Sequence, residues 1–331
     1  MPYTQISPDN LELQVNLEYP SQGIIVCDAE LYSFHADFFG TGPLPLIKLE
    51  AAEANKNLDT VNSLYCFFCD QELKRGDIVH VFGGGIVCDI AAFAASTYKR
   101  GCHLHLYPST LLAMVDAAIG GKTGVNFRSF KNHIGSFYPA ERVLIHPDFL
   151  RSLPLAELRQ GYAEMLKGHL LWNELPLPDF DGQLPTVEDI LSHALYKISI
   201  CRKDPFDVDT RRLLNFGHSF AHALEGLSDF AIKHGDAVAL GMNMACDLSL
   251  ELDLIDKARY TDLKNTLGLY PYPAAALDFA AKQSPEDILP WLRQDKKNSK
   301  KLSLILPVGD QIKAVEISLS QLRHWSSKRI N

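Results

Sequence analysis

The chain has 331 residues, of which 47% are hydrophobic and 22% are charged, and its formal net charge is −8. This composition is that of a globular protein and excludes fibrous and disordered classes. The acidic balance excludes a surface built to bind nucleic acid or an anionic membrane, and a chain of this length predicts two domains.

No apolar run is long enough to cross a bilayer, and the first residues lack the basic and apolar regions of a signal peptide. The seven cysteines are an odd number scattered through apolar stretches, as in a reduced protein without a disulfide framework. We therefore expect a cytoplasmic protein with no membrane partner.

Short apolar runs alternate with helical patterns in the first half of the chain. We expect strands at residues 23–28, 77–82 and 103–107 and helices at 59–72 and 86–98. Strands that alternate with helices predict βαβ units and a largely parallel sheet. This half, residues 1–150, is expected to be an α/β nucleotide-binding domain.

Helical patterns dominate the second half. We expect helices at residues 155–171, 186–201, 209–228 and 235–252, with a proline-rich acidic loop at 173–185. Residues 151–331 are therefore expected to form an all-helical domain.

Three glycines, Gly83 to Gly85, follow the second predicted strand and precede a helix. Backbone N–H groups at a helix N-terminus can cradle a pyrophosphate, and glycine lets it approach closely. A tight turn that needs a positive φ explains the glycines equally well. Asp89, in the first turn of that helix, either stabilises the helix dipole or contacts a cofactor.

Residues 116–126 are unusual for a core element because they combine two adjacent glycines, Lys122 and Asp116, with Lys131 and Asn132 shortly after. Close backbone approach and two cations suit a phosphorylated ligand. Either lysine alone would more often be a solvated surface residue.

Glu164, His218, His222 and His234 form the strongest candidate cluster, because each lies in an otherwise mainly apolar helical pattern. One carboxylate and two imidazoles are typical of a catalytic zinc site. Any one of these histidines could instead be a buried, hydrogen-bonded core residue. Spacing does not decide which three residues bind; the i, i+4 pair His218 and His222 would be favoured by analogy with His-Glu-x-x-His enzymes.

Together the motifs resemble the 3-dehydroquinate synthases of the sugar phosphate cyclase superfamily. The matching motifs occur in order at residues 81–89, 98–101, 108–116, 120–123, 131–135, 213–218 and 234–235. The resemblance runs from about Asp28 to residues 295–297 and implies an α/β Rossmann-like N-terminal domain, an all-α C-terminal domain and a homodimer.

The resemblance assigns roles residue by residue. It implies that Glu164, His218 and His234 hold a divalent metal, zinc or cobalt, so that His222 becomes a substrate or proton-relay residue. Catalytic roles fall on Lys122, Lys167, Lys197, Arg211, Asn215 and His222. Substrate contacts fall on Asp116, Lys131, Asn132 and one lysine of residues 296–297, taken as Lys297, while Arg100 reaches the phosphate of the partner subunit's substrate. The positions around NAD are Asp28, Glu53, Lys56, Gly84, Gly85, Asp89, Ser109 and Thr110.

Several residues depart from the family pattern. Cys88 and Ala92 stand where glycines are usual, Ser109 replaces a threonine, Ala117 and Ala118 replace a serine pair, and Asp236 stands where glutamate is common. These changes are expected to bear mostly on NAD affinity and loop packing, because every matched cation and metal ligand is present.

The implied activity is the conversion of 3-deoxy-D-arabino-heptulosonate 7-phosphate to 3-dehydroquinate and phosphate, a carbon–oxygen lyase step of the shikimate pathway and of aromatic amino acid biosynthesis. It proceeds by transient oxidation with NAD, phosphate elimination, re-reduction and aldol cyclisation. The alternatives are a sister cyclase for another sugar phosphate, a metal-dependent polyol or glycerol-phosphate dehydrogenase, and a catalytically dead relative. The retained ligands and lysines speak against the last.

Overall fold

The structure, a computed structural model, describes residues 6–14, 16–40, 42–128, 130–293 and 301–324. The chain folds into two compact units, each made of two stretches of sequence. Unit 1 comprises residues 1–158 and 186–206, and unit 2 comprises residues 159–185 and 207–331. A single boundary near residue 150 therefore differs from the structure, because residues 186–206 belong to the first unit.

Unit 1 is built on a six-stranded sheet whose strand order is β1-β8-β5-β4-β2-β3, with every neighbouring pair parallel. Its strands are β1 (Leu11–Leu13), β2 (Ile24–Asp28), β3 (Leu46–Leu49), β4 (Ile78–Gly83), β5 (His103–Pro108) and β8 (Arg142–Ile145). Its helices are α1 (Ala29–Phe34), α2 (Ala36–Gly40), α3 (Leu58–Asp70), α4 (Gly85–Thr97) and α6 (Val187–Lys203). The predicted parallel α/β domain is confirmed.

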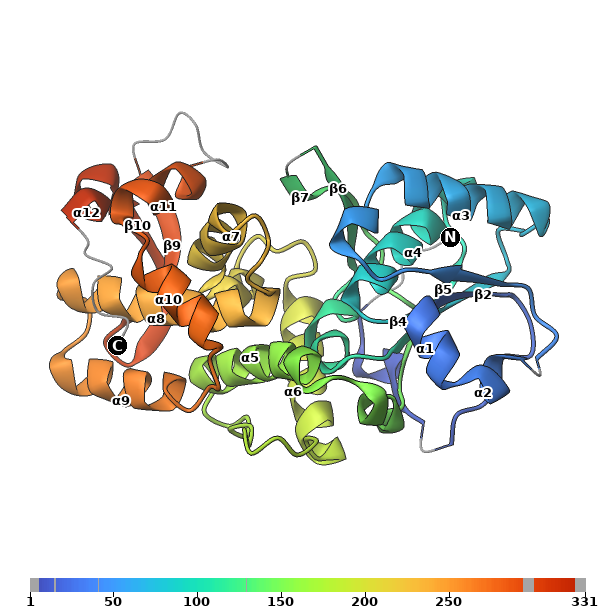
Figure 1. The fold of residues 1–331 in the computed structure, drawn as a ribbon, viewed down its shortest axis with the longest axis horizontal. Coiled ribbons are helices and arrows are strands. Elements are labelled where there is room, and N and C mark those ends of the chain that lie inside the picture. Colours follow the sequence, from blue (N-terminus) through green and yellow to red (C-terminus); the bar gives the residue numbers. More distant parts are fainter. Residues whose placement is uncertain (1–5, 15, 41, 129, 294–300, 325–331) are drawn as a thin grey trace. The chain divides into compact units, whose positions relative to one another are not determined.

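Alternation along the central strands supplies both faces of the sheet with buried side chains. Val79 and Val81 of β4 belong to an aliphatic core that includes residues of α3 and α4. On the other face, Phe82 contacts Phe39 of α2 edge to face at a centroid distance of 5.2 Å and stacks on Tyr107 of β5 at 3.9 Å. Figure 1 shows helices on both sides of this sheet, as expected for a doubly wound fold.

A two-stranded antiparallel hairpin of unit 1, β6 (Lys122–Phe127) and β7 (Phe130–Phe137), was not predicted. It carries the lysines that the sequence singled out for a phosphorylated ligand. The segment before it, Ala113–Ala117, forms a π-helical turn, a feature that is frequent at functional sites.

Unit 2 is mainly helical, as predicted, and also contains an antiparallel hairpin of β9 (Lys301–Val308) and β10 (Gln311–Ser318), which the all-α expectation did not include. Its helices are α7 (His218–Leu227), α8 (His234–Glu251), α9 (Lys257–Leu267), α10 (Ala274–Ala281), α11 (Pro285–Leu292) and α12 (Leu319–His324), together with α5 (Leu155–Leu171), whose first residues belong to unit 1. None of the helices in the described ranges has the length and apolar character that a bilayer crossing needs.

The prediction of a single helix at residues 209–228 is wrong, because the structure interrupts the helix before residue 218. A short 3₁₀ helix covers Thr210–Asn215, and α7 begins only after Gly217. Gly217 has a positive φ of 81°, and a Cβ there would lie 2.7 Å from Cγ of Met242 and 2.8 Å from the carbonyl oxygen of Val238. The glycine therefore lets the start of α7 pack directly against α8.

Candidate metal centre and sheet-edge site

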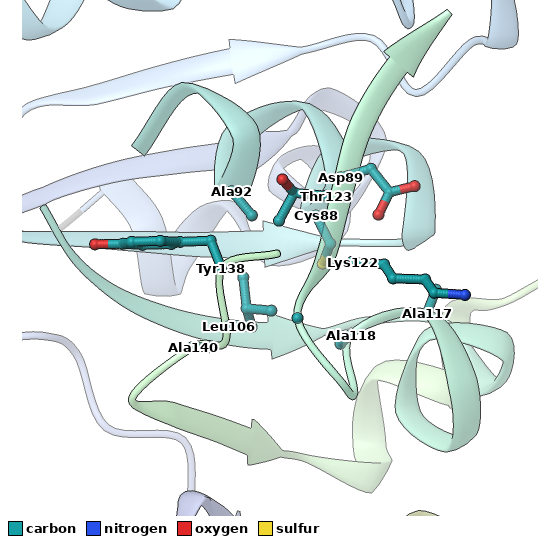
Figure 2. A pocket seen from close by; sticks show the side chains of 11 residues that line it. Cys88, Asp89, Ala92, Leu106, Ala117, Ala118, Lys122, Thr123, Tyr138 and Ala140 are labelled. Atoms are coloured by element: carbon teal, nitrogen blue, oxygen red, sulfur yellow. The ribbon is translucent and has the colours of Figure 1, made fainter. Parts of the chain in front are cut away.

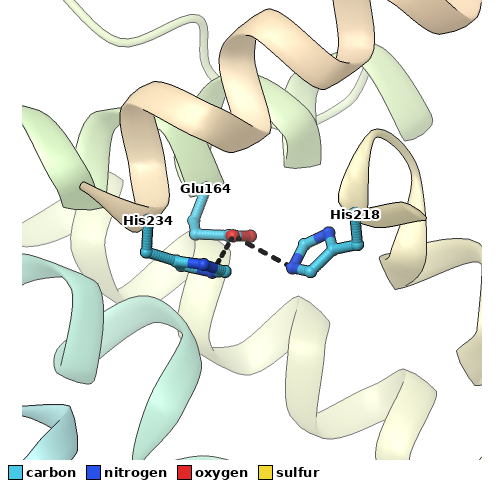
Figure 3. Close-up of side chains that lie close together, drawn as sticks. All are labelled: Glu164, His218 and His234. Carbon is cyan, nitrogen blue, oxygen red and sulfur yellow. Dashed lines mark ion pairs between the residues drawn. The ribbon is translucent and has the colours of Figure 1, made fainter. Parts of the chain in front are cut away.

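Three helices of unit 2 bring Glu164, His218 and His234 together (Figure 3). Glu164 lies within α5, and the two histidines are the first residues of α7 and α8. Nε2 of each histidine lies 3.6 Å from Oε1 of Glu164, and one potential ligand atom from each residue lies within 4.8 Å of the others. Ligand atoms at about 2.0–2.1 Å from a tetrahedral ion are about 3.3 Å apart, so this cluster fits a divalent cation with little adjustment.

The chemistry of the Glu164 carboxylate supports the same conclusion. Its side chain is 3% exposed, and Oε1 has no hydrogen-bond donor among the described residues. Lys167, one turn along α5 and equally buried, forms an ion pair with Oε2. Burial alone would raise the pKa of Glu164, but Lys167 and the two histidines outweigh burial and hold that pKa well below its usual range. The group is therefore an anion with one oxygen directed at two imidazoles.

His218 is buried in a setting that favours its neutral form. Burial, reinforced by the positive charge of Lys167, lowers the pKa of His218 to about 3. Its Nδ1 lies 3.3 Å from the carbonyl oxygen of Phe216, so a proton on Nδ1 leaves the lone pair on Nε2, which faces Glu164.

His234 lies between two carboxylates, one of which the sequence analysis missed. Its Nδ1 lies 3.4 Å from Oε1 of Glu225, a residue of α7 that is 1% exposed. Burial would lower the pKa of His234, but Glu164 and Glu225 outweigh burial and raise that pKa to about 10. The two carboxylates therefore stabilise positive charge on the ring, and a metal ion at Nε2 would have to displace the proton there. Glu225, near Nδ1, would then orient the ring as in the carboxylate–histidine–metal arrangement of zinc enzymes. Glu225 is seven residues after His218, two helical turns, and that spacing is the signal that could have revealed it.

The structure separates His222 from this cluster. His222 is exposed on α7, with its ring centroid 5.8 Å from that of His218, and the cluster of ligand atoms consists of Glu164, His218 and His234. The spacing-based preference for the His218 and His222 pair is therefore not supported by geometry. Arg211 is buried in the 3₁₀ helix before α7, and Asn215 ends that helix.

In unit 1, the predicted nucleotide residues follow neighbouring parallel strands. Asp28 ends β2, Gly84 follows β4 and Ser109 follows β5, so they lie at the same edge of the sheet. Asp28 caps α1 by accepting the backbone N–H of Glu30 at 2.8 Å. Gly84 precedes α4 and supplies no side-chain cap, which leaves the first N–H groups of that helix for an anion. Thr110 accepts the N–H of Ala113 at 3.1 Å.

A polar network connects residues assigned to NAD with residues assigned to substrate. Oε1 of Glu53 accepts a hydrogen bond from the Asn126 side chain at 2.7 Å and lies 3.9 Å from Nζ of Lys131. Oδ1 of Asn126 accepts the backbone N–H of Asn132 at 2.9 Å, and the Asn126 N–H bonds the carbonyl of Lys56 at 2.8 Å. Asn126 is the member of this network that sequence reasoning did not single out.

Two buried or partly buried ion pairs lie beside it. Lys56, which is 6% exposed, donates to Oδ2 of Asp89 at 2.5 Å. Lys197 of α6 forms an ion pair with the Asp116 carboxylate and donates to the Asp116 carbonyl at 2.7 Å. The acidic partners therefore hold both ammonium groups in place within unit 1.

A small pocket of unit 1 lies among α4, β6 and the residues before β8 (Figure 2). Its charged lining residues are Asp89 and Lys122. Four of the residues that depart from the family pattern also line it, namely Cys88, Ala92, Ala117 and Ala118. The other two departures, Ser109 and Asp236, lie outside this lining. Arg100 is exposed at the end of a 3₁₀ turn, and Lys297 lies outside the described residues.

Comparison with known proteins decides the family. Models of the 3-dehydroquinate synthase N-terminal and C-terminal domains match residues 46–160 and 161–298. The chain belongs to the 3-dehydroquinate synthase family. It is 39% identical to the 3-dehydroquinate synthase of Chlamydia caviae, over 77% of this chain and 72% of that protein, and 39% identical to the enzyme of Thermococcus kodakarensis, over 80% and 76%.

Solved structures of sugar phosphate cyclases share the fold. A 2-deoxy-scyllo-inosose synthase complexed with carbaglucose-6-phosphate, NAD⁺ and Co²⁺ is similar with a TM-score of 0.80 and 22% identity, over 97% of this chain and 91% of that one. A 2-epi-5-epi-valiolone synthase from Streptomyces hygroscopicus with NAD⁺ and Zn²⁺ gives 0.78 and 25%, over 94% of each chain. The predicted combination of an α/β domain and a helical domain is therefore that of the family.

Proposed function

We propose that this member of the 3-dehydroquinate synthase family converts 3-deoxy-D-arabino-heptulosonate 7-phosphate into 3-dehydroquinate and phosphate. The proposal includes a divalent metal ion, zinc or cobalt, and NAD that is reduced and reoxidised within each turnover. It also includes a carbon–oxygen lyase reaction, a place in the shikimate pathway, a cytoplasmic location and a homodimer in which Arg100 serves the partner subunit's substrate.

The observation that carries the proposal is the convergence of Glu164, His218 and His234. These side chains would hold the metal ion, because they offer one anionic oxygen and two imidazole nitrogens at suitable separations. A bound divalent cation supplies Lewis-acid polarisation of the substrate oxygens. The two cyclases described above contain Co²⁺ or Zn²⁺, which makes these ions the first to test.

NAD binding is proposed at the edge of the unit 1 sheet. The first N–H groups of α4, after Gly84 and Gly85, would bind the pyrophosphate, since they carry the positive end of the helix dipole. The other assigned contacts are Asp28, Glu53, Lys56, Asp89, Ser109 and Thr110. Bound NAD supplies a hydride acceptor that later returns the hydride.

The cationic residues suit a small substrate that bears a carboxylate and a phosphate. Unit 2 supplies the buried Lys167 and Arg211, and Asn215 and His222 complete its assigned polar groups. Unit 1 supplies Lys122, Lys131 and Lys197, with Asp116 and Asn132 as hydrogen-bonding partners for hydroxyl groups. Charge-assisted hydrogen bonds contribute roughly 1.5–3 kcal/mol each, so several together would fix the orientation of a doubly anionic substrate.

The decisive experiment supplies the purified enzyme with the heptulosonate phosphate, Zn²⁺ or Co²⁺ and a catalytic amount of NAD⁺, and follows phosphate and NADH together. We expect stoichiometric phosphate release without accumulation of NADH. Accumulation of NADH on a polyol or glycerol phosphate would instead support the dehydrogenase alternative, whose fold is also similar: a probable glycerol dehydrogenase has a TM-score of 0.59 at 15% identity, over 91% of this chain and 89% of that one. Turnover only with sedoheptulose 7-phosphate or glucose 6-phosphate would support a sister cyclase.

A further inference from the structure

A buried polar network lies beside the metal cluster of unit 2 and is centred on Asp236, two residues after His234. The Asp236 side chain is 4% exposed and accepts hydrogen bonds from four donor atoms. Arg159 donates through Nε at 2.8 Å and through a terminal nitrogen at 3.2 Å, Gln160 donates at 3.2 Å, and the Tyr270 hydroxyl donates at 2.7 Å. One carboxylate therefore joins α5, α8 and the segment before α10.

Gln160 also completes the start of α8. The residue before that helix, Lys233, provides no side-chain cap. Oε1 of Gln160 instead accepts the backbone N–H of Gly235 at 2.7 Å and that of Asp236 at 3.2 Å. These are first-turn N–H groups, which have no acceptor within the helix itself. The capping group of α8 thus comes from α5, the helix that carries Glu164.

The two backbones approach closely at this point. A Cβ at Gly235 would lie 2.5 Å from the carbonyl oxygen of Gln160 and 2.6 Å from its Cα, so no larger residue fits without moving one helix. Gln160 precedes Glu164 by four residues and shares its helix face, while Gly235 directly follows His234. Each end of the network is therefore within one helical turn of a proposed ligand.

We propose that Gln160 and Asp236 are positioning residues that hold the start of α8 against α5 and so fix His234 at ligand distance from Glu164. The inference rests on the proposed metal centre and deepens it, because it names the residues that set ion affinity and coordination geometry without touching the ion. A merely structural network would affect only folding stability.

The test compares variants of Asp236 with a matched control on the same helix. Asp247 is also buried, at 4% exposure, and accepts hydrogen bonds from a tyrosine and a cation, Tyr260 at 2.8 Å and Lys264 at 3.2 Å. It lies eleven residues after Asp236, about 16 Å along α8. Asp247→Asn should therefore destabilise the fold as Asp236→Asn does, with no effect at His234.

The measurements are Co²⁺ and Zn²⁺ affinity by competition with a chelator, the visible absorption spectrum of the Co²⁺ form, and urea unfolding. We expect Asp236→Asn and Gln160→Met to weaken ion binding about 10- to 100-fold, the range found for residues that support metal ligands, and to change the Co²⁺ spectrum. Asp247→Asn should retain wild-type affinity and spectrum, and Asp236→Glu should recover part of the loss. Tyr270→Phe removes the hydroxyl that donates to Asp236 at 2.7 Å and to the Arg159 carbonyl at 3.3 Å. It leaves the Arg159 and Gln160 donors to Asp236 in place and so provides a milder variant if Asp236→Asn does not fold.

Wild-type affinity and spectrum in Gln160→Met and Tyr270→Phe, with reduced stability, would overturn this inference and leave the metal centre intact. A wild-type protein that binds neither ion would overturn the metal centre and this inference together.

Discussion

The two units build their candidate sites in different ways. In unit 1, the site follows from backbone geometry, since Asp28, Gly84 and Ser109 lie where neighbouring parallel strands end and where a helix begins. In unit 2, the site consists of side chains from three helices, oriented by buried partners such as Lys167 and Glu225. A backbone-built site tolerates changes of side chain, whereas a side-chain cluster does not. The departures at Cys88, Ala92, Ser109, Ala117 and Ala118 fall in unit 1, and the departure at Asp236 falls in unit 2 outside the cluster of ligand atoms.

Glu164→Ala is expected to have the largest effect of any single change, because it removes the carboxylate on which the site of unit 2 depends. We expect the variant to lose bound metal and at least about 1000-fold in kcat/KM, because the remaining two imidazoles offer no anionic ligand. Elemental analysis of the purified protein checks the metal content. His222→Ala is the matched control, since His222 lies outside the cluster and this variant should keep its metal while losing turnover. A fully loaded Glu164→Ala protein would contradict the ligand assignment.

Arg211→Ala is expected to have the next largest effect. If the buried guanidinium binds a substrate anion as proposed, its removal should lower kcat/KM at least about tenfold, the equivalent of one charge-assisted hydrogen bond. The neighbouring Arg212 donates to Oγ of Ser303 at 3.0 Å, so Arg212→Ala should leave turnover within about twofold. Steady-state kinetics of the two variants decide the matter, and equal activities would remove Arg211 from the substrate site.

A pH effect tests the packing of the unit 1 sheet. Burial lowers the pKa of His80 to about 4, and burial together with the charge of His80 lowers the pKa of His105 to about 4. The unfolded chain, with histidine pKa values near 6.5, binds more protons than the folded chain between these values. Stability is therefore complete above about pH 6.5 and falls as the pH is lowered toward 4.

Between pH 7.5 and 5.5 each histidine should cost about 1.4 kcal/mol of unfolding free energy. Urea unfolding at the two pH values measures this loss of unfolding free energy. His105→Leu leaves only His80 to contribute, so the loss due to this pair should be roughly half of that in the wild type. An unchanged dependence in the variant would show that these rings are not the source.

Cys88→Ala is the mildest change and probes the tolerance of the sheet-edge site. The Cys88 thiol donates a hydrogen bond to the carbonyl of Gly83 at 3.4 Å, and burial raises the pKa of this thiol. Since backbone N–H groups are the proposed pyrophosphate ligands, NAD affinity measured by calorimetry should change by less than about threefold. A tenfold change would show that side chains of the pocket take part in NAD binding.

Much of unit 1 could be predicted from local patterns. The apolar runs at β2, β4 and β5 and the helices α3 and α4 were placed to within a residue or two, because each buries a periodic set of side chains against one sheet. The hairpin of β6 and β7 was missed, since lysines, asparagines and glycines interrupt its few apolar residues and no regular apolar alternation remains. Residue propensities do not predict strands of this kind, in which many of the side chains are polar.

The candidate metal centre was harder to derive. Spacing favoured His218 with His222, and the choice of His234 came from family resemblance, because the decisive contact depends on how α8 packs on α5 and α7. The helix break at Gly217 was missed for the same reason. Its positive φ is needed because α7 packs closely against Met242 of α8, a contact between distant parts of the sequence. Long-range packing of this kind leaves little signal in a single sequence.

The chain passes from one unit to the other after residues 158, 185 and 206, so neither unit is a continuous piece of sequence. A fragment that ended at residue 150 would lack α6 and with it the Lys197 ammonium that neutralises Asp116. During synthesis on the ribosome, the sheet of unit 1 would be complete before that helix emerged. Asp116 in the π-helical turn would wait for Lys197, which is made 81 residues later. Truncation screens and domain exchanges should therefore follow these three crossing points rather than a single cut.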